Sequence, residues 1–75
     1  MSEHRLDARG LKCPLPVLKA RKALKPLAPG ETLLVEATDP SAVRDFASFC
    51  ETTGHELVES AQDGELYRFV IRKTG

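Results

Sequence analysis

The hydrophobic and polar positions along this chain change their period several times, and each period predicts a different element. Polar and apolar residues alternate over residues 5–8, which predicts a short first strand that ends before Gly10. Over residues 17–28 the apolar side chains recur at helical spacing and predict a first helix. Residues 31–38 contain three successive aliphatic side chains and predict a buried central strand.

The second half of the chain continues in the same way. Asp39-Pro40 combines an N-cap acceptor with a proline suited to the first helical turn, so it predicts the start of a second helix, which ends at Gly54. Two further strands are predicted over residues 56–61 and 65–73, joined by a hairpin turn at Asp63-Gly64. The predicted apolar stripe of the second helix comprises Val43, Phe46, Ala47 and Cys50.

The elements follow one another in the order strand, helix, strand, helix, strand, strand. This order predicts an α/β (α+β) two-layer sandwich, in which both helices pack on one face of a four-stranded mixed sheet. With 75 residues and no linker or repeat between the elements, the chain is expected to form a single domain over residues 1–75. A domain of this size buries only about 60% of its unfolded surface, so we expect no deep substrate cleft.

Charge adds a feature that the hydrophobic pattern does not show. Eleven basic side chains balance eleven acidic ones, so the net charge gives no bias toward nucleic acid or a membrane. Residues 1–25, however, carry seven basic and two acidic side chains. This asymmetry predicts a basic face around Cys13 and an acidic face elsewhere, which would orient a partner, although a solvated helix surface has the same pattern. Candidate partner contacts on the first helix are Leu18, off the apolar stripe, and Lys19 and Lys22.

The first helix begins at the motif Cys13-Pro14-Leu15-Pro16. Proline is tolerated only in the first turn of a helix, so the two prolines predict a helix start and place Cys13 at or beside the N-cap. Because the prolines lack amide hydrogens, mainly the N–H of Leu15 is left to point at a group bound on Cys13. The motif therefore presents one cysteine on a rigid frame formed by Pro14 and Pro16.

A cysteine at this position is expected to be reactive. The positive end of the helix dipole favours a thiolate, and Arg9 and Lys12, close in sequence, are expected to favour it further. Such a sulfur can take up a group and give it away, and a persulfide is a natural cargo because its terminal sulfur is anionic at neutral pH. The neighbouring Leu15 is a further candidate contact. The alternative interpretation is an inert cysteine beside a helix start.

The remaining residues favour no other chemistry. A hydrolase cysteine needs a base, but the two histidines are His4, near the N-terminus, and His55, at the start of the third strand. No second ligand stands at metal-binding spacing around Cys13 and no glycine-rich phosphate loop occurs, so we expect no metal and no cofactor. Cys50 lies on the apolar stripe of the second helix and is expected to be a core residue, with an accessory redox role as the alternative.

No part of the sequence has the pattern of a targeting or membrane segment. Residues 1–4 contain no apolar run, and no stretch approaches 18 apolar residues. We expect a cytoplasmic monomer in which both cysteines are reduced, because a structural disulfide is rare in that compartment.

Beyond these inferences, the sequence resembles the TusA (SirA-like) family of sulfur carriers over nearly its whole length. The resemblance begins with Leu6-Asp7-Ala8, Gly10-Leu11 and the family-specific motif Cys13-Pro14-x-Pro16. It continues through residues 29–34, 39–40, 44–45, 49–50, 55–58, 63–64, 67–68 and 71–73. The later segments resemble the TusA branch rather than relatives in selenium metabolism or sulfur oxidation.

The resemblance implies that Cys13 carries sulfur as a persulfide, with Pro14 and Pro16 as its structural frame. It further implies that a cysteine desulfurase supplies the sulfur and that a sulfur-relay complex passes it on for 2-thiolation of wobble uridine in transfer RNA. Molybdenum-cofactor synthesis and sulfur oxidation are alternative destinations. The chain would then be a sulfurtransferase-type carrier rather than a stand-alone enzyme, in contact with proteins and not with RNA. A non-catalytic regulatory interaction module, a thiol-redox protein and a nucleic-acid-binding protein are the rival functions.

Overall fold

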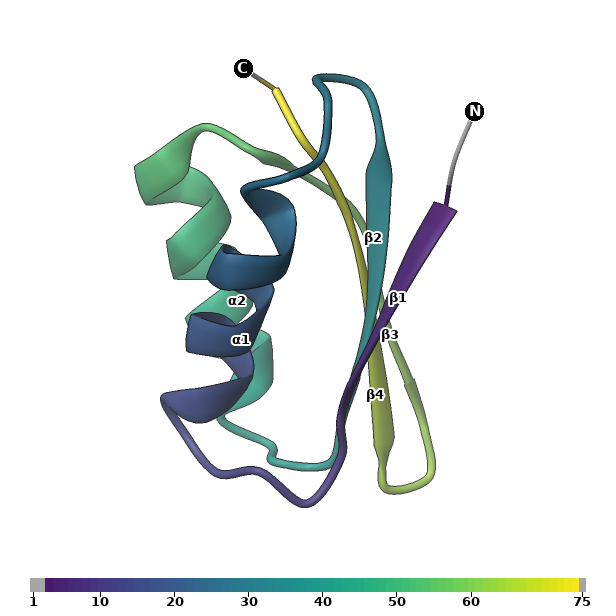
Figure 1. The fold of residues 1–75 in the computed structure, drawn as a ribbon. Coiled ribbons are helices and arrows are strands. Elements are labelled where there is room, and N and C mark those ends of the chain that lie inside the picture. The colour runs from purple at the N-terminus through teal and green to yellow at the C-terminus, as the bar shows by residue number, and fades with distance from the viewer. Residues whose placement is uncertain (1–2, 75) are drawn as a thin grey trace.

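The structure, a computed structural model, describes residues 3–74 and has the predicted two-layer arrangement. Both helices lie on one side of the sheet, and the two connections that lead into the helices lie together at one end of the molecule (Figure 1). The elements in chain order are β1 (Glu3–Ala8), α1 (Leu15–Leu24), β2 (Thr32–Ala37), α2 (Ala42–Thr53), β3 (Glu56–Asp63) and β4 (Leu66–Arg72).

The sheet has four strands in the order β1-β2-β4-β3. β1 and β2 are parallel, whereas β4 runs antiparallel to both of its neighbours, so the sheet is mixed as predicted. The parallel pair requires a crossover connection, which α1 provides. β2 lies inside the sheet, and this confirms the central position that its aliphatic run predicts.

The core lies between the sheet and the two helices. Phe46 of α2 stacks on Phe69 of β4 with ring centroids 4.6 Å apart, and both side chains are fully buried. Ala20 and Leu24 of α1 and Val35 of β2 belong to the same buried cluster. Burying a large apolar side chain stabilises a fold by about 1.5–3 kcal/mol. The shared core therefore holds the two helices in fixed positions and sets the geometry at their N-terminal ends.

α1 ends at Leu24, four residues before the predicted end. Pro26 has no amide hydrogen to donate to the carbonyl of Lys22, and its ring would clash with that carbonyl if the helix continued. The chain tightens instead, because the amides of Lys25 and Leu27 bond to carbonyls three residues earlier. Leu27 is nevertheless buried and completes the core beyond the helix end.

α2 begins at Ala42, with Ser41 at its N-cap, and not at Asp39-Pro40 as predicted. Asp39 does act as an acceptor, because its Oδ1 accepts a hydrogen bond from the Ser41 amide at 3.0 Å. This bond lies in a turn that precedes the helix, and the Ala42 amide closes the same turn by donating to the Asp39 carbonyl at 2.9 Å. The aspartate therefore organises the approach to the helix rather than its first turn.

The buried face of α2 is also displaced from the predicted stripe. Phe46 and Cys50 are buried as predicted, and Ala42 joins them. Val43 and Ala47, which the spacing placed on the stripe, are exposed. Ala42, Phe46 and Cys50 are separated by four residues each, so they form one row that turns the other two side chains outward.

Strand boundaries differ from the prediction by two residues at two ends. β1 begins at Glu3, two residues earlier, and β3 continues to Asp63, two residues later. Asp63 pairs with Leu66, so the hairpin turn consists of Gly64 and Glu65 and lies one residue further along than predicted. Gly64 has a φ of +63°, which is a left-handed conformation that glycine adopts at no steric cost.

Candidate functional site

Cys13 lies in the β1–α1 loop, at the end of the sheet where this loop meets the β2–α2 loop (Figure 1). Hydrogen bonds join the two loops: the Cys13 amide donates to Asp39 Oδ2 at 2.7 Å, and the Gly10 amide donates to Thr38 Oγ1 at 2.9 Å. The thiol itself is exposed. One loop therefore presents the sulfur to solvent while the other loop holds its backbone in place.

The cysteine motif forms the start of α1, with Pro14 at the N-cap and Pro16 buried in the first turn. Cys13 is the residue immediately before the N-cap, which confirms its predicted position. The Leu15 amide donates to the carbonyl of Lys12 at 2.8 Å. It closes a turn and is not available to a group on the sulfur, so that prediction is wrong. The Cys13–Pro14 peptide bond is cis.

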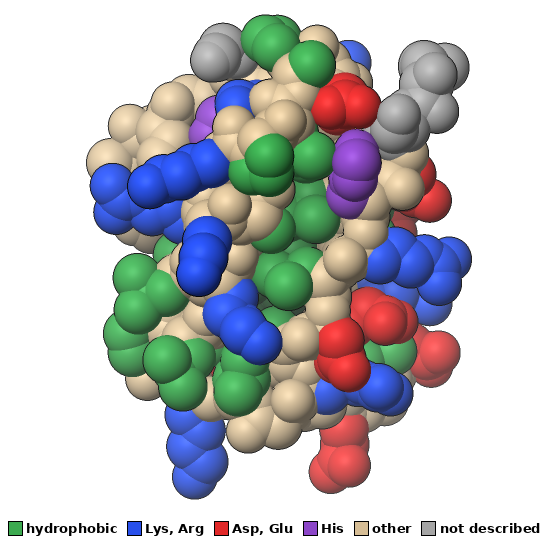
Figure 2. All heavy atoms as spheres, viewed as in Figure 1, with side chains coloured by type: hydrophobic (Ala, Val, Ile, Leu, Met, Phe, Trp, Pro, Cys, Tyr) green, Lys and Arg blue, Asp and Glu red, His purple; other side chains and the backbone are tan. Residues whose placement is uncertain are grey.

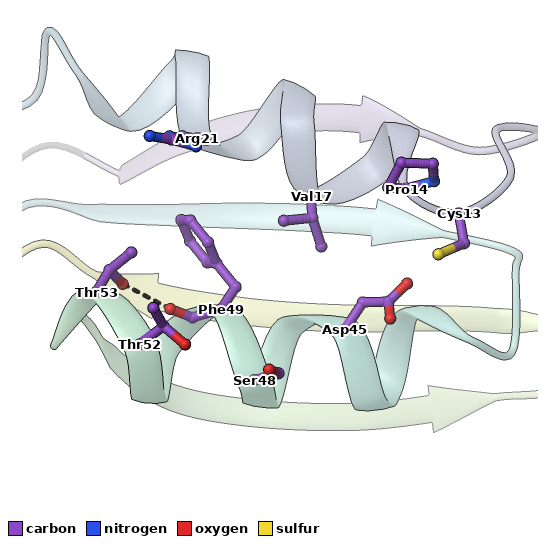
Figure 3. Close-up of a pocket in the computed structure, with 9 residues that line it drawn as sticks. All are labelled: Cys13, Pro14, Val17, Arg21, Asp45, Ser48, Phe49, Thr52 and Thr53. Atoms are coloured by element: carbon purple, nitrogen blue, oxygen red, sulfur yellow. Dashed lines mark hydrogen bonds between the residues drawn. The ribbon is translucent and has the colours of Figure 1, made fainter.

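Asp45, in the first turn of α2, faces the sulfur (Figure 3). Hydrogen bonding to the Asp45 side chain is the largest cause that raises the pKa of Cys13 above its ordinary value. Partial desolvation and the negative charges of Asp45 and Asp39 raise this pKa further. The expectation that the surroundings favour a thiolate is therefore wrong, and the free protein holds Cys13 as a thiol at neutral pH.

The two basic residues expected beside the sulfur act on carboxylates instead. Arg9 Nε lies 3.0 Å from Asp7 Oδ1 and Arg9 Nη2 lies 3.2 Å from Asp7 Oδ2. This side-chain pairing is the main cause that lowers the pKa of Asp7 to about 2. Lys12 acts on Asp39, whose pKa is lowered chiefly by the hydrogen bond from the Ser41 backbone and to a smaller extent by the charge of Lys12. Neither base contributes to the pKa of Cys13.

An open groove of about 380 Å³ runs from Cys13 between α1 and α2. Figure 3 shows Cys13 and Asp45 at one end, Val17 and Phe49 pointing into the space between the helices, and Arg21 toward the other end. Pro14, Ser48, Thr52 and Thr53 complete the lining. The exposed Cys13 sulfur thus stands at one end of a largely apolar groove.

The predicted contact residues all occupy exposed positions on α1. Leu15 and Leu18 are 48% and 51% exposed, although they are large apolar side chains. Lys19 and Lys22 are exposed on the same helix. Figure 2 shows hydrophobic side chains gathered over the start of α1, with Lys and Arg side chains beside them. The surface is therefore accessible, and its role in binding stays a prediction.

Cys50 is 5% exposed in α2, and burial raises the pKa of its thiol. This confirms the predicted core position. Among residues 3–74, no group of three or more His, Cys, Asp or Glu side chains is arranged to hold a metal ion. Of the two free cysteines, Cys13 is exposed and Cys50 is buried.

The two histidines lie at the end of the molecule away from Cys13. His55 follows the C-terminal end of α2, and its Nδ1 accepts a hydrogen bond from the Thr74 amide at 3.3 Å. His4 lies in β1, with its Nε2 3.5 Å from Glu31 Oε2. His55 is the polar strand-end residue that its position predicts, and neither side chain is placed to act as a base for Cys13.

Known proteins share this arrangement. A sequence model of the family described as Sulfurtransferase TusA matches residues 4–73. The chain belongs to the TusA family. The fold of this TusA-family protein is also similar to the crystal structure of a SirA-like protein from Desulfitobacterium hafniense, with a TM-score of 0.83 and 25% sequence identity. That similarity covers 99% of this chain and 100% of the other, so it supports the two-layer fold over the whole domain.

The sequence of this TusA-family protein predicts Cys13, Pro14 and Pro16, but it does not single out the two carboxylates that contact the motif. Asp39 bonds to the backbone of Cys13, and the Asp45 side chain raises the pKa of its thiol. The sequence signal that could have found these two aspartates is their position. Both aspartates stand at the start of the second helix, and helices that follow two parallel strands begin at the same edge of the sheet.

Proposed function

We propose that this TusA-family protein is a sulfur carrier that holds sulfur as a persulfide on Cys13. The observation that carries the proposal is the exposed thiol at the end of the groove, on a loop held by hydrogen bonds. Such a thiol can bond to the terminal sulfur of a donor persulfide and later give that sulfur to an acceptor. Because a thiolate is the leaving group in both steps, neither step needs a catalytic triad.

The proposed donor is a cysteine desulfurase, and the proposed acceptor is a sulfur-relay complex that supplies 2-thiolation of wobble uridine in transfer RNA. This destination rests on the family resemblance of the sequence. Delivery to molybdenum-cofactor synthesis or to sulfur oxidation would use the same chemistry at Cys13 and is the alternative. Exposed Leu15 and Leu18 suit short-lived docking to proteins, because small apolar contacts beside charged residues favour transient binding.

The proposed setting is the cytoplasm, where the protein acts as a monomer. A reducing compartment keeps Cys13 free to exchange sulfur. Within residues 3–74, the helices are too short or too polar to cross a bilayer.

Intact-mass measurement after incubation with a cysteine desulfurase and cysteine tests the proposal. Wild type is expected to gain one sulfur atom, about +32 Da, which a reducing thiol then removes. Cys13→Ser is expected to gain none, because a serine hydroxyl cannot form a persulfide. Cys50→Ala is the matched control, since it removes the buried thiol of α2, and it is expected to load as the wild type does.

Two results would contradict the proposal in different ways. Equal sulfur on wild type and Cys13→Ser would show that Cys13 is not the carrier residue. No gain on a folded wild type, with an active desulfurase, would favour a regulatory interaction module, whose partner binding survives Cys13→Ser. A thiol-redox protein would instead lose its activity in Cys50→Ala.

A further inference from the structure

Asp45 and Cys13 approach each other from different elements at the mouth of the groove. Cys13 belongs to the β1–α1 loop and Asp45 to the first turn of α2, and Figure 3 shows the carboxylate directed toward the sulfur. The two residues also line a second hollow together with Arg44. Asp45 is half-buried, so its carboxylate is less screened from the sulfur than a fully solvated one.

The other charged groups around the two hollows come from every neighbouring element. Asp39 lies in the β2–α2 loop and Lys12 in the β1–α1 loop, while Arg21 of α1 and Arg44 of α2 line the hollows. The groups that act on the Cys13 thiol are Asp45, by a hydrogen bond and by charge, and Asp39, by charge. The charged groups that act on the thiol are therefore acidic, although Lys12, Arg21 and Arg44 also lie around the two hollows.

We propose that Asp45 makes Cys13 a weak holder of sulfur, so that a loaded carrier gives its cargo up readily. The inference rests on the proposed persulfide function and adds Asp45 as the residue that sets the balance between loaded and empty Cys13. In the empty carrier the carboxylate faces a neutral thiol. In the loaded carrier it faces a persulfide, which is more acidic than a thiol and is anionic at neutral pH. The same side chain thus stabilises the empty form and destabilises the loaded one.

The exchange with a small persulfide shows where each atom goes. The Cys13 sulfur bonds to the terminal sulfur of the donor, and the S–S bond of the donor breaks. The electron pair leaves with the inner sulfur of the donor, which takes up the proton that Cys13 has lost. A neutral thiol and an anionic persulfide stand on both sides of this equilibrium. Asp45 acts on the thiol and the persulfide of Cys13 but not on those of the small molecule, so it shifts the equilibrium toward release.

The test measures this equilibrium with glutathione persulfide and glutathione at a fixed ratio and neutral pH. The loaded-to-empty ratio of Cys13 is read from the mass gain of about +32 Da. Asp45→Asn keeps an acceptor of the same shape and removes the charge, and it is expected to raise this ratio roughly three- to tenfold. Glu51→Gln removes one charge from an exposed position of the same helix, outside both hollows, and is expected to match wild type.

A second readout follows the empty thiol alone. The rate at which iodoacetamide alkylates Cys13, followed on its own peptide by mass spectrometry, rises with pH as the thiolate forms. Asp45→Asn is expected to shift this rise to lower pH, while Glu51→Gln leaves it in place. Asp45→Ser, which also removes the carboxylate, provides the same test if the asparagine variant does not fold.

The outcomes separate the inference from the proposed function. If wild type loads on Cys13 but the folded Asp45 variants show the same loading ratio and alkylation profile, the role of Asp45 is overturned and the carrier function stands. If neither wild type nor any variant gains sulfur from glutathione persulfide or from a desulfurase, the proposed function is overturned. The proposed role of Asp45 in persulfide release is then overturned as well. A higher loading ratio together with a shifted alkylation profile would support the inference.

Discussion

At the scale of the single residue, Asp39 joins the two loops that form the site. Its Oδ1 accepts the Ser41 amide at 3.0 Å and its Oδ2 accepts the Cys13 amide at 2.7 Å. The hydrogen bond from the Ser41 backbone is the largest cause that lowers the pKa of Asp39, and the bond from the Cys13 backbone is the next. A carboxyl whose pKa is lowered by folding stabilises the protein above its ordinary pKa of 3.8, and this stabilisation is lost as the pH falls through the lower value of the folded state.

Asp39→Asn is therefore expected to lower the free energy of unfolding at pH 7, because an amide oxygen forms weaker bonds to these N–H groups than a carboxylate does. The difference from wild type is expected to shrink as the pH falls below about 4, because the carboxyl of the unfolded state takes up a proton there and that of the folded state follows at lower pH. Urea unfolding at pH 7 and pH 3 measures both values. Asp63→Asn, an exposed aspartate beside the hairpin turn, is the control. An equal deficit of Asp39→Asn at the two pH values would contradict this account.

The same scale shows which part of the site the sequence can predict. The place of Cys13 follows from local rules, because two prolines within three residues fix a helix start. The charge around its sulfur does not follow from neighbours along the chain. Arg9 is close in sequence but its side chain turns back to Asp7, while Asp45 is distant in sequence and faces the thiol. Tertiary packing alone decides which charge the sulfur meets.

At the scale of the element, periodicity correctly predicts the type and order of both helices and all four strands, because each has a clear spacing of apolar residues. The boundaries depend on contacts with other segments. β1 begins at Glu3 because Thr32 of β2 offers it a partner, and no pattern within the first strand contains that information. The end of α1 is likewise shared with a distant residue, since Lys73 Nζ donates to the carbonyls of Lys25 and Leu27 at 3.0 Å and 2.7 Å.

Lys73→Met is expected to lower the free energy of unfolding by about 1 kcal/mol, because two carbonyls after α1 lose a charged donor while the apolar stem of the side chain is kept. Amide hydrogen exchange near Leu27 is expected to become faster. Lys22→Met removes an exposed lysine from the same helix and is the control. Chemical unfolding that shows equal stability for the two variants would argue against a capping role for Lys73.

At the scale of the whole molecule, basic side chains lie on both faces although the net charge is zero. Lys19 and Lys22 are exposed on α1, on the helical side of the molecule, whereas Arg5 and Arg68 lie on strand positions that alternate with core residues and face away from the helices. The immediate surroundings of the sulfur are acidic, so the predicted basic face lies along α1 and not around Cys13 itself. A field of this kind orients a charged partner before contact.

Reversing Lys19 and Lys22 to glutamate is expected to weaken binding to a cysteine desulfurase by roughly tenfold at low salt, because the attraction that orients the encounter is lost. The salt dependence of the affinity is expected to decrease as well. The double reversal of Arg5 and Arg68 changes the net charge equally on the opposite face and is the control. Titration calorimetry at two salt concentrations measures both, and equal weakening by the two pairs would mean that α1 is not the docking surface.

The bond between the Cys13 amide and Asp39 limits how far the cargo can travel. A carrier with a long flexible arm can visit two sites while both partners stay bound. Under the proposed function, a persulfide would extend the Cys13 side chain by only about 2 Å, from a loop that a second loop holds in place. A donor and an acceptor would then have to occupy the same few ångströms around the sulfur, and they would not bind together. The pace of sulfur delivery would depend on how quickly the carrier leaves its donor.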